Sequence, residues 1–318
     1  MYIITGSTGM IGSSTCEFYL NKKKPIIGID NDLRKYFFGT HGSNKWKEKK
    51  LRKDKNYKHY SVDIRNKIKI FEIFKNYKKK IKAVIHTAAQ PSHDWAAKEP
   101  FTDFDVNANG TLNLLEALRK YCPNASFVFT STNKVYGDNP NFLPLEEKKT
   151  RWEIKNSHKF KLGIDETMSI DNCTHSFFGA SKAYADIIVQ EYGKNIGLKT
   201  ACFRAGCITG PNHSGAKLHG FLSYLVKATL SKKHYTLIGY KGKQVRDNIH
   251  SYDLVNCFWE FYKKPKKGEV YNIGGGRYSN CSIIEALDMV ENVTNIKIKR
   301  NIKKQNRIGD HIWYVSSM

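Results

Sequence analysis

Residues 2–12 read Tyr-Ile-Ile-Thr-Gly-Ser-Thr-Gly-Met-Ile-Gly and set the architecture of this 318-residue chain. A short apolar run, typical of a buried strand, leads into a glycine-rich turn, and a helix pattern begins near Met10. Gly6 allows the tight bend, Gly9 lets backbone N–H groups approach a pyrophosphate, and Gly12 lets the helix pack closely on the sheet. Because the helix also directs unpaired N–H groups at the turn, the pattern predicts a dinucleotide-binding site.

An acidic residue supports this interpretation. The next apolar run, Pro25–Ile29, ends at Asp30. A carboxylate at this place can accept hydrogen bonds from an adenosine ribose and would repel a 2′-phosphate, which favours NAD over NADP. The alternative, a glycine-rich turn of another α/β protein, fits less well because the strand, the helix and the acid occur in register.

Strand and helix patterns alternate along the rest of the chain, which predicts a doubly wound parallel sheet. The expected strands cover residues 60–65, 82–89, 126–131 and 200–204, and the expected helices cover 68–77, 106–121, 178–193 and 220–231. A polar loop is expected up to residue 58, and irregular chain is expected over 138–175.

Composition narrows the possible partners. The net charge is +24, but the lysines are spread widely and no nucleic-acid motif accompanies them, so we expect no specific nucleic-acid partner. The seven cysteines include no CxxC pair, which indicates reduced thiols and no metal site. Since no apolar run reaches about 18 residues and a strand at Tyr2 leaves no room for a signal peptide, we expect a cytoplasmic protein that does not bind membranes.

Motifs along nearly the whole chain resemble the extended short-chain dehydrogenase/reductase superfamily, which includes nucleotide-sugar epimerases and dehydratases. The markers are the glycine turn, Asp63-Ile64-Arg65, His86-Thr87-Ala88-Ala89, Asn107 with Gly110-Thr111, residues 131–137, Lys182 and Arg246-Asp247. Within the superfamily, Ser-Thr-Asn-Lys-Val-Tyr-Gly-Asp (131–138) and Gly-Lys-Gln-Val-Arg-Asp (242–247) are most similar to the CDP-paratose 2-epimerases, also called CDP-tyvelose 2-epimerases.

The resemblance implies a Rossmann-type NAD-binding domain over 1–206, to which 248–264 returns, and a smaller substrate-binding cap over 207–318. Relatives usually continue with a further helical segment after this point, so we expect either a shortened cap or a truncated gene. The resemblance further implies NAD as cofactor, a nucleotide-diphosphate sugar, with a CDP-sugar favoured, as substrate, a homo-oligomer, and a place in nucleotide-sugar metabolism for cell-surface polysaccharides.

The resemblance also assigns roles to residues. Thr132 would hold the sugar hydroxyl that is oxidised, Lys182 would hold the nicotinamide ribose, and Arg246 would face the diphosphate. The implied cofactor contacts are Gly6, Thr8, Gly9, Met10, Ile11, Gly12, Asp30, Asn31, Asp63, Ile64, Thr87, Ala88, Ala89, Asn107 and Lys182. The implied substrate contacts are Gln90, Thr132, Asn133 and Arg246.

One pair of residues argues against a 4,6-dehydratase. In those relatives an Asp-Glu pair follows the catalytic threonine and performs the elimination. Here the pair is Asn133-Lys134, and neither side chain can act as the carboxylic acid or carboxylate base that loss of water needs.

The chain departs from the superfamily at the catalytic tyrosine. The expected Tyr-x-x-x-Lys reads Phe178-Gly179-Ala180-Ser181-Lys182, and a benzene ring has no proton to exchange. General acid–base help of this kind contributes about 10²–10⁴-fold in rate. Either another group carries the proton (His93, Lys134, Tyr136 or His175), or Lys182 itself does so, desolvated by Phe177 and Phe178, or the site binds without turnover.

Three functions therefore stay open: a 2-epimerase of a CDP-sugar, a C4-epimerase of a UDP- or GDP-sugar, and a non-catalytic NAD-binding protein. Among the remaining polar residues, His86 follows a buried strand and is expected to be structural. Cys207 is expected to be a small apolar neighbour of the nicotinamide. His213 and His219 flank a glycine-containing loop that is interpreted either as a substrate lid or as plain surface.

Overall fold

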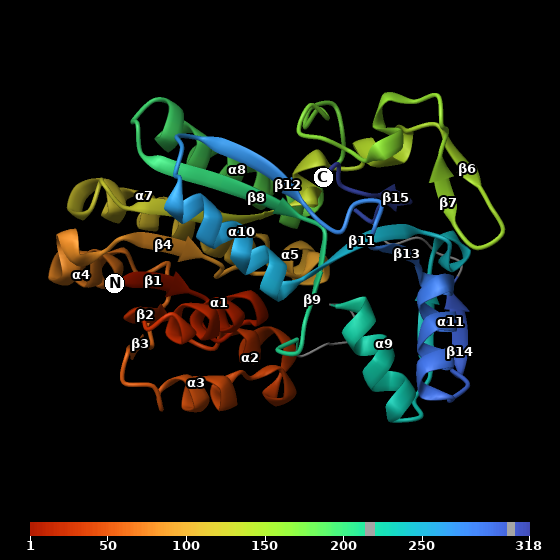
Figure 1. Ribbon diagram of the computed structural model, residues 1–318, viewed down its shortest axis with the longest axis horizontal. Coiled ribbons are helices and arrows are strands. Elements are labelled where there is room, and N and C mark those ends of the chain that lie inside the picture. Colours follow the sequence, from red (N-terminus) through yellow and green to blue (C-terminus); the bar gives the residue numbers. More distant parts are fainter. Residues whose placement is uncertain (214–219, 304–308) are drawn as a thin grey trace.

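A parallel sheet between two layers of helices forms the centre of the molecule (Figure 1). The structure, a computed structural model, describes residues 1–213, 220–303 and 309–318. Within these residues the sheet has seven strands in the order β12-β8-β5-β4-β1-β2-β3. Their bounds are β1 (Tyr2–Thr5), β2 (Ile26–Ile29), β3 (Tyr57–Tyr60), β4 (Ala83–His86), β5 (Ser126–Thr132), β8 (Lys199–Ala205) and β12 (Glu269–Ile273). The predicted Rossmann-type sheet is confirmed, and its order reverses between β1 and β4, where such sheets bind ligands.

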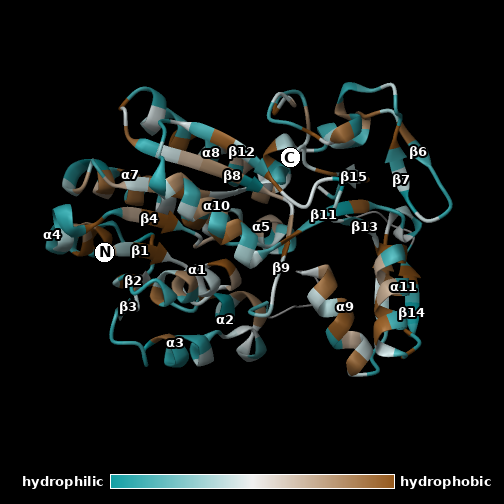
Figure 2. Cartoon of the chain, viewed as in Figure 1, coloured by the Kyte–Doolittle hydropathy of each residue, from teal (hydrophilic) through white to brown (hydrophobic). Residues whose placement is uncertain are grey.

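Both faces of the sheet are buried because the strands alternate between two apolar sides. Ile3 and Val84 pack with α4 (Lys67–Tyr77), α7 (Gly110–Tyr121) and α8 (Ser176–Lys194) on one face. Ile4 and Ile85 pack with α1 (Met10–Asn21) and α10 (Ser251–Lys263) on the other. Figure 2 shows the resulting hydrophobic residues on the central strands β1 and β4.

A second group of elements lies at the carboxyl ends of the strands. Helices α9 (Phe221–Leu230) and α11 (Ile283–Thr294) pack together beside the strand pair β10 (Tyr235–Ile238) and β14 (Arg300–Lys303) (Figure 1). A small sheet joins them to the centre, and its strands are β9 (Cys207–Thr209), β11 (Val245–His250), β13 (Asn280–Ser282) and β15 (Trp313–Tyr314). These elements hold the residues that face the ends of the central strands.

The returning segment is longer than expected. Helix α10 packs against α1, in line with the return of residues 248–264, but β12 then also pairs in parallel with β8. The part of the chain that returns to the central sheet therefore runs on to Ile273.

Two expectations for the chain after β2 are wrong. The lysine-rich stretch expected as a loop contains α2 (Leu33–Phe38) and α3 (Lys45–Leu51). Strand β3 covers 57–60 and not 60–65, so Asp63-Ile64-Arg65 lies in the connection after it. The strand begins three residues earlier than expected because Tyr57 packs into the core, where its hydroxyl lies 2.9 Å from Ser7 Oγ in the glycine turn.

Smaller differences concern the ends of elements. The expected helix 106–121 begins with a π-helical turn over Asp105–Asn109 before α7, and two short helices, α5 (His93–Lys98) and α6 (Pro100–Phe104), precede it. The irregular segment 138–175 contains a hairpin of β6 (Leu145–Glu147) and β7 (Trp152–Ile154). In the described parts of the chain, no helix has both the length and the apolar composition of a membrane span.

Candidate active site

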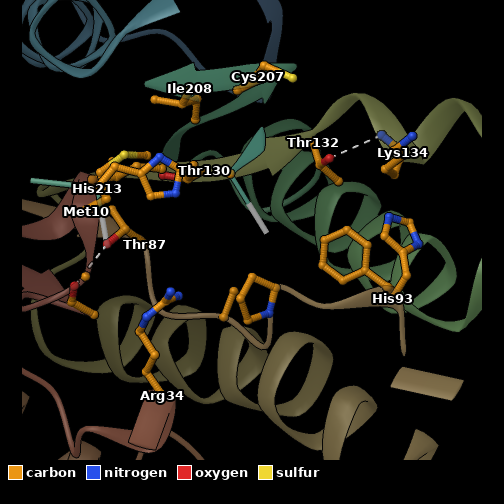
Figure 3. A pocket seen from close by; sticks show the side chains of 18 of the residues that line it. Met10, Arg34, Thr87, His93, Thr130, Thr132, Lys134, Cys207, Ile208 and His213 are labelled. Atoms are coloured by element: carbon orange, nitrogen blue, oxygen red, sulfur yellow. Dashed lines mark hydrogen bonds between the residues drawn. The ribbon is translucent and has the colours of Figure 1, made fainter. Parts of the chain in front are cut away.

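A cavity of about 530 Å³ runs along the carboxyl ends of the central strands. The glycine turn and the ends of β2, β4, β5 and β8 form one wall, and α9, β10 and β11 form the other. Figure 3 shows side chains around this space, among them Met10 near the glycine turn and Thr132 at the end of β5. A single cavity therefore joins the predicted cofactor turn to the predicted substrate residues.

The glycine turn has the tight geometry that its sequence predicts. Gly6 has a φ of +63° and sits against the backbone of Thr87 and Ala88, just after β4. A Cβ built on Gly12 would lie 2.0 Å from the carbonyl oxygen of Gly6. Met10, Ile11 and Gly12 line the cavity in the first turn of α1, where backbone N–H groups have no intrahelical acceptor. The turn thus presents amide donors to the cavity, as an anionic pyrophosphate requires.

Asp30 lies at the cavity with part of its acceptor capacity already used. Its Oδ2 accepts from the backbone N–H and the hydroxyl of Thr8 at 2.9 and 2.7 Å, and its Oδ1 accepts from the N–H of Asp32 at 2.8 Å. A carboxylate offers about four acceptor sites, so capacity remains for a ribose hydroxyl. Thr8 is buried and does not line the cavity, so the structure places it as the anchor of Asp30.

Asn31, Asp63 and Ile64 also line this end of the cavity. Asn31 donates from Nδ2 to Asp63 Oδ2 at 2.9 Å, and Arg65 binds both oxygens of the same carboxylate. Burial opposes ionisation of Asp63, but these bonds lower its pKa below the usual value. The Asp63 carboxylate therefore stays charged, and its bonds to Asn31 and Arg65 hold it in place.

Lys182 is buried on the wall formed by the central strands, at the end away from Asp30. Its Nζ donates to the carbonyl oxygen of Thr130 at 2.9 Å and lies 4.0 Å from the centre of the Phe129 ring. Burial lowers the pKa of Lys182 to about 8. Thr132 lies on the same wall, where its Oγ1 accepts from the N–H of Lys134 at 3.2 Å, and Asn133 lines the cavity beside it.

Phe178 lines the cavity in the place of the superfamily's tyrosine, with the His93 ring 4.8 Å away at 61°. Of the four substitute proton carriers named from the sequence, His93 and Lys134 line the cavity. Tyr136 is buried elsewhere and donates to Asn272 Oδ1 at 2.8 Å, while His175 Nε2 lies 2.9 Å from the carbonyl of Val135. The structure therefore brings two of the four candidates to the site.

Two predicted contacts, Gln90 and Asn107, lie one layer behind the cavity wall. Both side chains donate to Asp103 Oδ1, at 2.8 and 3.0 Å, and Ser181 donates to Asp103 Oδ2 at 2.5 Å. Burial raises the pKa of Asp103. This network ties α6 and the π-helical turn to α8, so it positions the helix that carries Lys182.

Arg246 lines the cavity opposite Thr132 and has a partner that the sequence did not reveal. Its NH2 group donates to Asp310 Oδ1 at 2.5 Å, and its NH1 group donates to the carbonyl of Val245 at 2.7 Å. Burial alone would raise the pKa of Asp310, but Arg246 and Lys134 hold it well below its usual range. Lys134 Nζ also donates to the carbonyl of Gly309 at 2.7 Å.

Three cationic or titratable side chains lie at the Asp30 end of the cavity, and only His213 among them was named from the sequence. Arg34, Lys47 and His213 line the cavity there, and Lys47 Nζ donates to the carbonyl of Asn212 at 2.6 Å. Burial lowers the pKa of Lys47 to about 8, and burial together with Arg34 and Lys47 lowers that of His213 to about 4. In the sequence, Lys47 is one of many lysines, and nothing separates it from its neighbours. His219, the other histidine that flanks the loop interpreted as a lid or as plain surface, lies outside the described residues.

One structural expectation is confirmed, and a second stays a prediction. His86 is buried between Thr5 and Thr111, whose hydroxyls lie 2.7 and 2.9 Å from its ring nitrogens. Cys207 lines the cavity, and burial raises the pKa of its thiol to about 12. Its place beside a nicotinamide stays a prediction. In the described parts of the chain no cluster of histidine, cysteine or acidic side chains is arranged to hold a metal.

A sequence model of the NAD dependent epimerase/dehydratase family matches residues 2–274. The chain belongs to this family. Its cofactor is accordingly NAD. Its relatives include CDP-paratose 2-epimerase of Salmonella typhi. The two sequences are 31% identical over 304 residues, which cover 93% of this chain and 85% of the Salmonella typhi protein. UDP-glucuronate 4-epimerase of Thermodesulfobacterium geofontis is 28% identical over 94% of this chain and 82% of that protein.

Solved structures share the fold of this epimerase/dehydratase family member. UDP-glucose 4-epimerase of Thermus thermophilus, in complex with NAD, has a TM-score of 0.78 at 24% identity and covers 99% of this chain and 90% of its own. A second structure is a tyrosine-to-phenylalanine mutant of UDP-glucuronic acid 4-epimerase from Bacillus cereus, in complex with NAD and a fluorinated sugar nucleotide. It has a TM-score of 0.79 at 22% identity and covers 99% of this chain and 89% of its own.

The residues on the cavity wall fit NAD. The amides of Met10, Ile11 and Gly12 suit the pyrophosphate, and Asp30 has acceptor capacity left for the ribose. The hydroxyl of Thr130 is buried on the cavity wall without a hydrogen-bond partner among the described residues. Such an atom suits the carboxamide of a nicotinamide ring, because a buried hydroxyl without a partner is otherwise costly.

Proposed function

We propose that this protein is an NAD-dependent nucleotide-sugar epimerase of the CDP-paratose 2-epimerase kind. The observation that carries the proposal is that Thr132 and Lys182 lie on one continuous cavity between the glycine turn and Arg246. NAD would supply a carbon that accepts a hydride from the sugar and returns it to the opposite face of the ketone.

In this proposal each residue has a role that its contacts allow. Thr132 orients the hydroxyl that is oxidised, and Lys182 holds the nicotinamide ribose. Arg246 faces the diphosphate with the N–H groups that Val245 and Asp310 do not use. Asp310 holds the guanidinium in place, so that its orientation does not have to be fixed when the substrate binds.

The chemistry around Thr132 supports epimerisation over dehydration. Asn133 and Lys134 both line the cavity where a dehydratase would need a carboxylic acid and a carboxylate. Asp310 is the nearby carboxyl group, 3.9 Å from Lys134 Nζ. Since Arg246 and Lys134 hold its pKa well below the usual range, it stays ionised and cannot donate a proton.

Two further functions remain candidates. A C4-epimerase of a UDP- or GDP-sugar is supported by the similarity to the Thermodesulfobacterium geofontis enzyme. A non-catalytic protein that binds NAD and a nucleotide sugar is supported by Phe178. The CDP-sugar hypothesis rests on residues 131–138 and 242–247 and on the similarity to the Salmonella typhi enzyme.

Product analysis separates these functions. Purified protein loaded with NAD is incubated with CDP-, UDP-, GDP- and dTDP-sugars, and the products are identified by NMR. Inversion at C2 of a CDP-sugar is the expected result, and inversion at C4 would favour the second candidate. Loss of water from the sugar, or no binding of NAD and of any nucleotide sugar, would contradict the proposal. Binding without turnover, followed by a large gain in Phe178→Tyr, would favour the non-catalytic candidate.

A further inference from the structure

We infer that the imidazole of His93 is the general acid/base of this site and performs the proton transfer that a phenol performs where the superfamily has tyrosine. The inference rests on the proposed epimerase function. His93 belongs to no catalytic motif in the sequence, and the fold places its ring next to that of Phe178.

The position of His93 is the first argument. The ring lines the cavity and meets Phe178 edge-on, with the two ring centres 4.8 Å apart. Figure 3 shows His93 on the same side of the cavity as Thr132 and Lys134, away from Met10, Arg34 and His213. His93 is therefore at the end where the sugar hydroxyl would be oxidised, not at the adenosine end.

The second argument is how firmly the ring is held. His93 begins α5, directly after the capping residue Ser92, and its Nδ1 lies 3.0 Å from the hydroxyl of Ser176. Ser176 begins α8 with a φ of +61°, a conformation that non-glycine residues keep only where the surrounding structure enforces it. A Cβ added to Gly309 would lie 3.3 Å from Nδ1 and 3.4 Å from the Cβ of Ser176, so a third segment packs closely on the ring. Three separate segments thus fix the ring.

The partner of Nδ1 suits a group that changes its protonation state. A serine hydroxyl can donate to a neutral ring nitrogen and can also accept from a protonated one, because it rotates. The step is balanced: the O–H proton of the sugar moves to a ring nitrogen of His93 as the C–H hydride leaves to the cofactor. On return, the imidazolium gives that proton back to the same oxygen while the hydride reaches the other face of the carbon.

The other basic side chains at this end are committed elsewhere. Lys182 Nζ donates to the carbonyl of Thr130, and Lys134 Nζ donates to the carbonyl of Gly309 and lies 3.9 Å from Asp310. Both lysines and Asp310 line the same cavity as His93, and Asp94 follows His93 in the chain. Histidine is also the side chain whose ordinary pKa lies near neutral pH.

The test compares His93→Gln with His158→Gln, a histidine in the η6 turn (Lys159–Leu162, with His158 at its N-cap) that does not line the cavity. We expect His93→Gln to lower kcat by about 10²–10⁴-fold and to remove the histidine-dependent limb of the pH profile. Its affinity for NAD and for CDP should stay unchanged. His158→Gln should keep the wild-type rate and pH profile.

A second variant gives the proton a new carrier. Phe178→Tyr places a phenol at the superfamily's position, so we expect it to restore turnover in the His93→Gln background. The gain there should exceed the gain from Phe178→Tyr in the wild-type background. Equal gains in both backgrounds would show that His93 and a tyrosine at position 178 do not perform the same proton transfer, and would overturn the inference.

A readout independent of turnover completes the test. In NAD-loaded protein with isotope-labelled histidines, the ring-nitrogen signals that disappear in His93→Gln should shift when a CDP-sugar is added, and those of His158 should not. Unchanged His93 signals, or wild-type kinetics in His93→Gln, would overturn the inference while leaving the epimerase intact. If the wild type turns over no sugar, the proposed function fails, and the inference fails with it.

Discussion

The two ends of the cavity are built in different ways. The cofactor end comes from β1, α1 and β2, where Gly6, Gly12 and Asp30 fall within one stretch of about thirty residues that forms a strand, a turn, a helix and a strand in sequence. The substrate end joins His93, Thr132, Lys182, Arg246 and Asp310 from segments far apart in the chain. A local turn carries its geometry in its own sequence, whereas the second constellation exists only after the sheet and the cap have packed.

The largest expected effect is in the glycine turn. In Gly12→Ala the new Cβ would lie 2.0 Å from the Gly6 carbonyl oxygen, so the turn and the start of α1 must move. Overpacking of this kind costs about 1–3 kcal/mol, and we expect a lower melting temperature without ligand and no measurable NAD binding.

Gly9→Ala is the matched control for that effect. Its Cβ would meet the carbonyl oxygen of Gly6 at 3.1 Å, which a small shift can relieve. Its unliganded stability should stay close to wild type while NAD affinity falls, because Gly9 faces the cavity. Calorimetry measures both quantities, and equal loss of stability in the two variants would contradict this account of the turn.

The next effect concerns Lys182. Lys182→Met removes the ammonium that would hold the nicotinamide ribose, and misplacement of a reacting group by about 1 Å can cost about 10²-fold. We therefore expect kcat to fall by at least that factor. Lys194→Met, at the exposed end of the same helix, should behave like wild type. Steady-state kinetics of both variants provide the comparison.

Arg246→Lys separates the two ends of the cavity. The charge remains, but the forked geometry that binds a diphosphate is lost, so we expect KM for the nucleotide sugar to rise about tenfold. NAD affinity should not change, since Arg246 belongs to the substrate end. A parallel loss of NAD affinity would mean that the two ends do not act separately.

The smallest effect is a change of stability with pH at Lys182. Its pKa of about 8 in the folded protein lies below the ordinary 10.5, so between these values the unfolded chain binds more protons and stability rises with pH. Below about pH 8, the buried charge destabilises the fold. Lys182→Met should therefore melt about 2–4 °C higher at pH 7, and thermal scans should show this advantage shrinking toward pH 10.5.

The contrast between the two ends also explains what the sequence could predict. The glycine spacing and Asp30 predicted the cofactor turn, because strand, turn and helix are neighbours in the chain. Thr132, Lys182 and Arg246 were found through motifs, and all three line the cavity. Asp310 carries no local signal, since its role depends on the packing of β11 beside the C-terminal segment.

Residues just behind the wall mark another limit of sequence analysis. Thr8, Gln90 and Asn107 were predicted as contacts, yet the structure places their side chains on Asp30 and Asp103. A buried polar side chain that supports a site has the same sequence context as one that touches a ligand. The α3 helix was missed for a related reason, because its buried face shows only Lys47 and Leu51 among exposed lysines.

The central claim is that the sugar carbon is inverted by removal and return of a hydride within one closed site. Turnover of the nucleotide sugar in deuterium oxide, followed by NMR of the product, measures this directly. The account predicts that the inverted carbon keeps its original hydrogen, because the hydride is held on the cofactor and does not exchange with solvent. Deuterium at that carbon would show inversion by proton abstraction and would contradict the account.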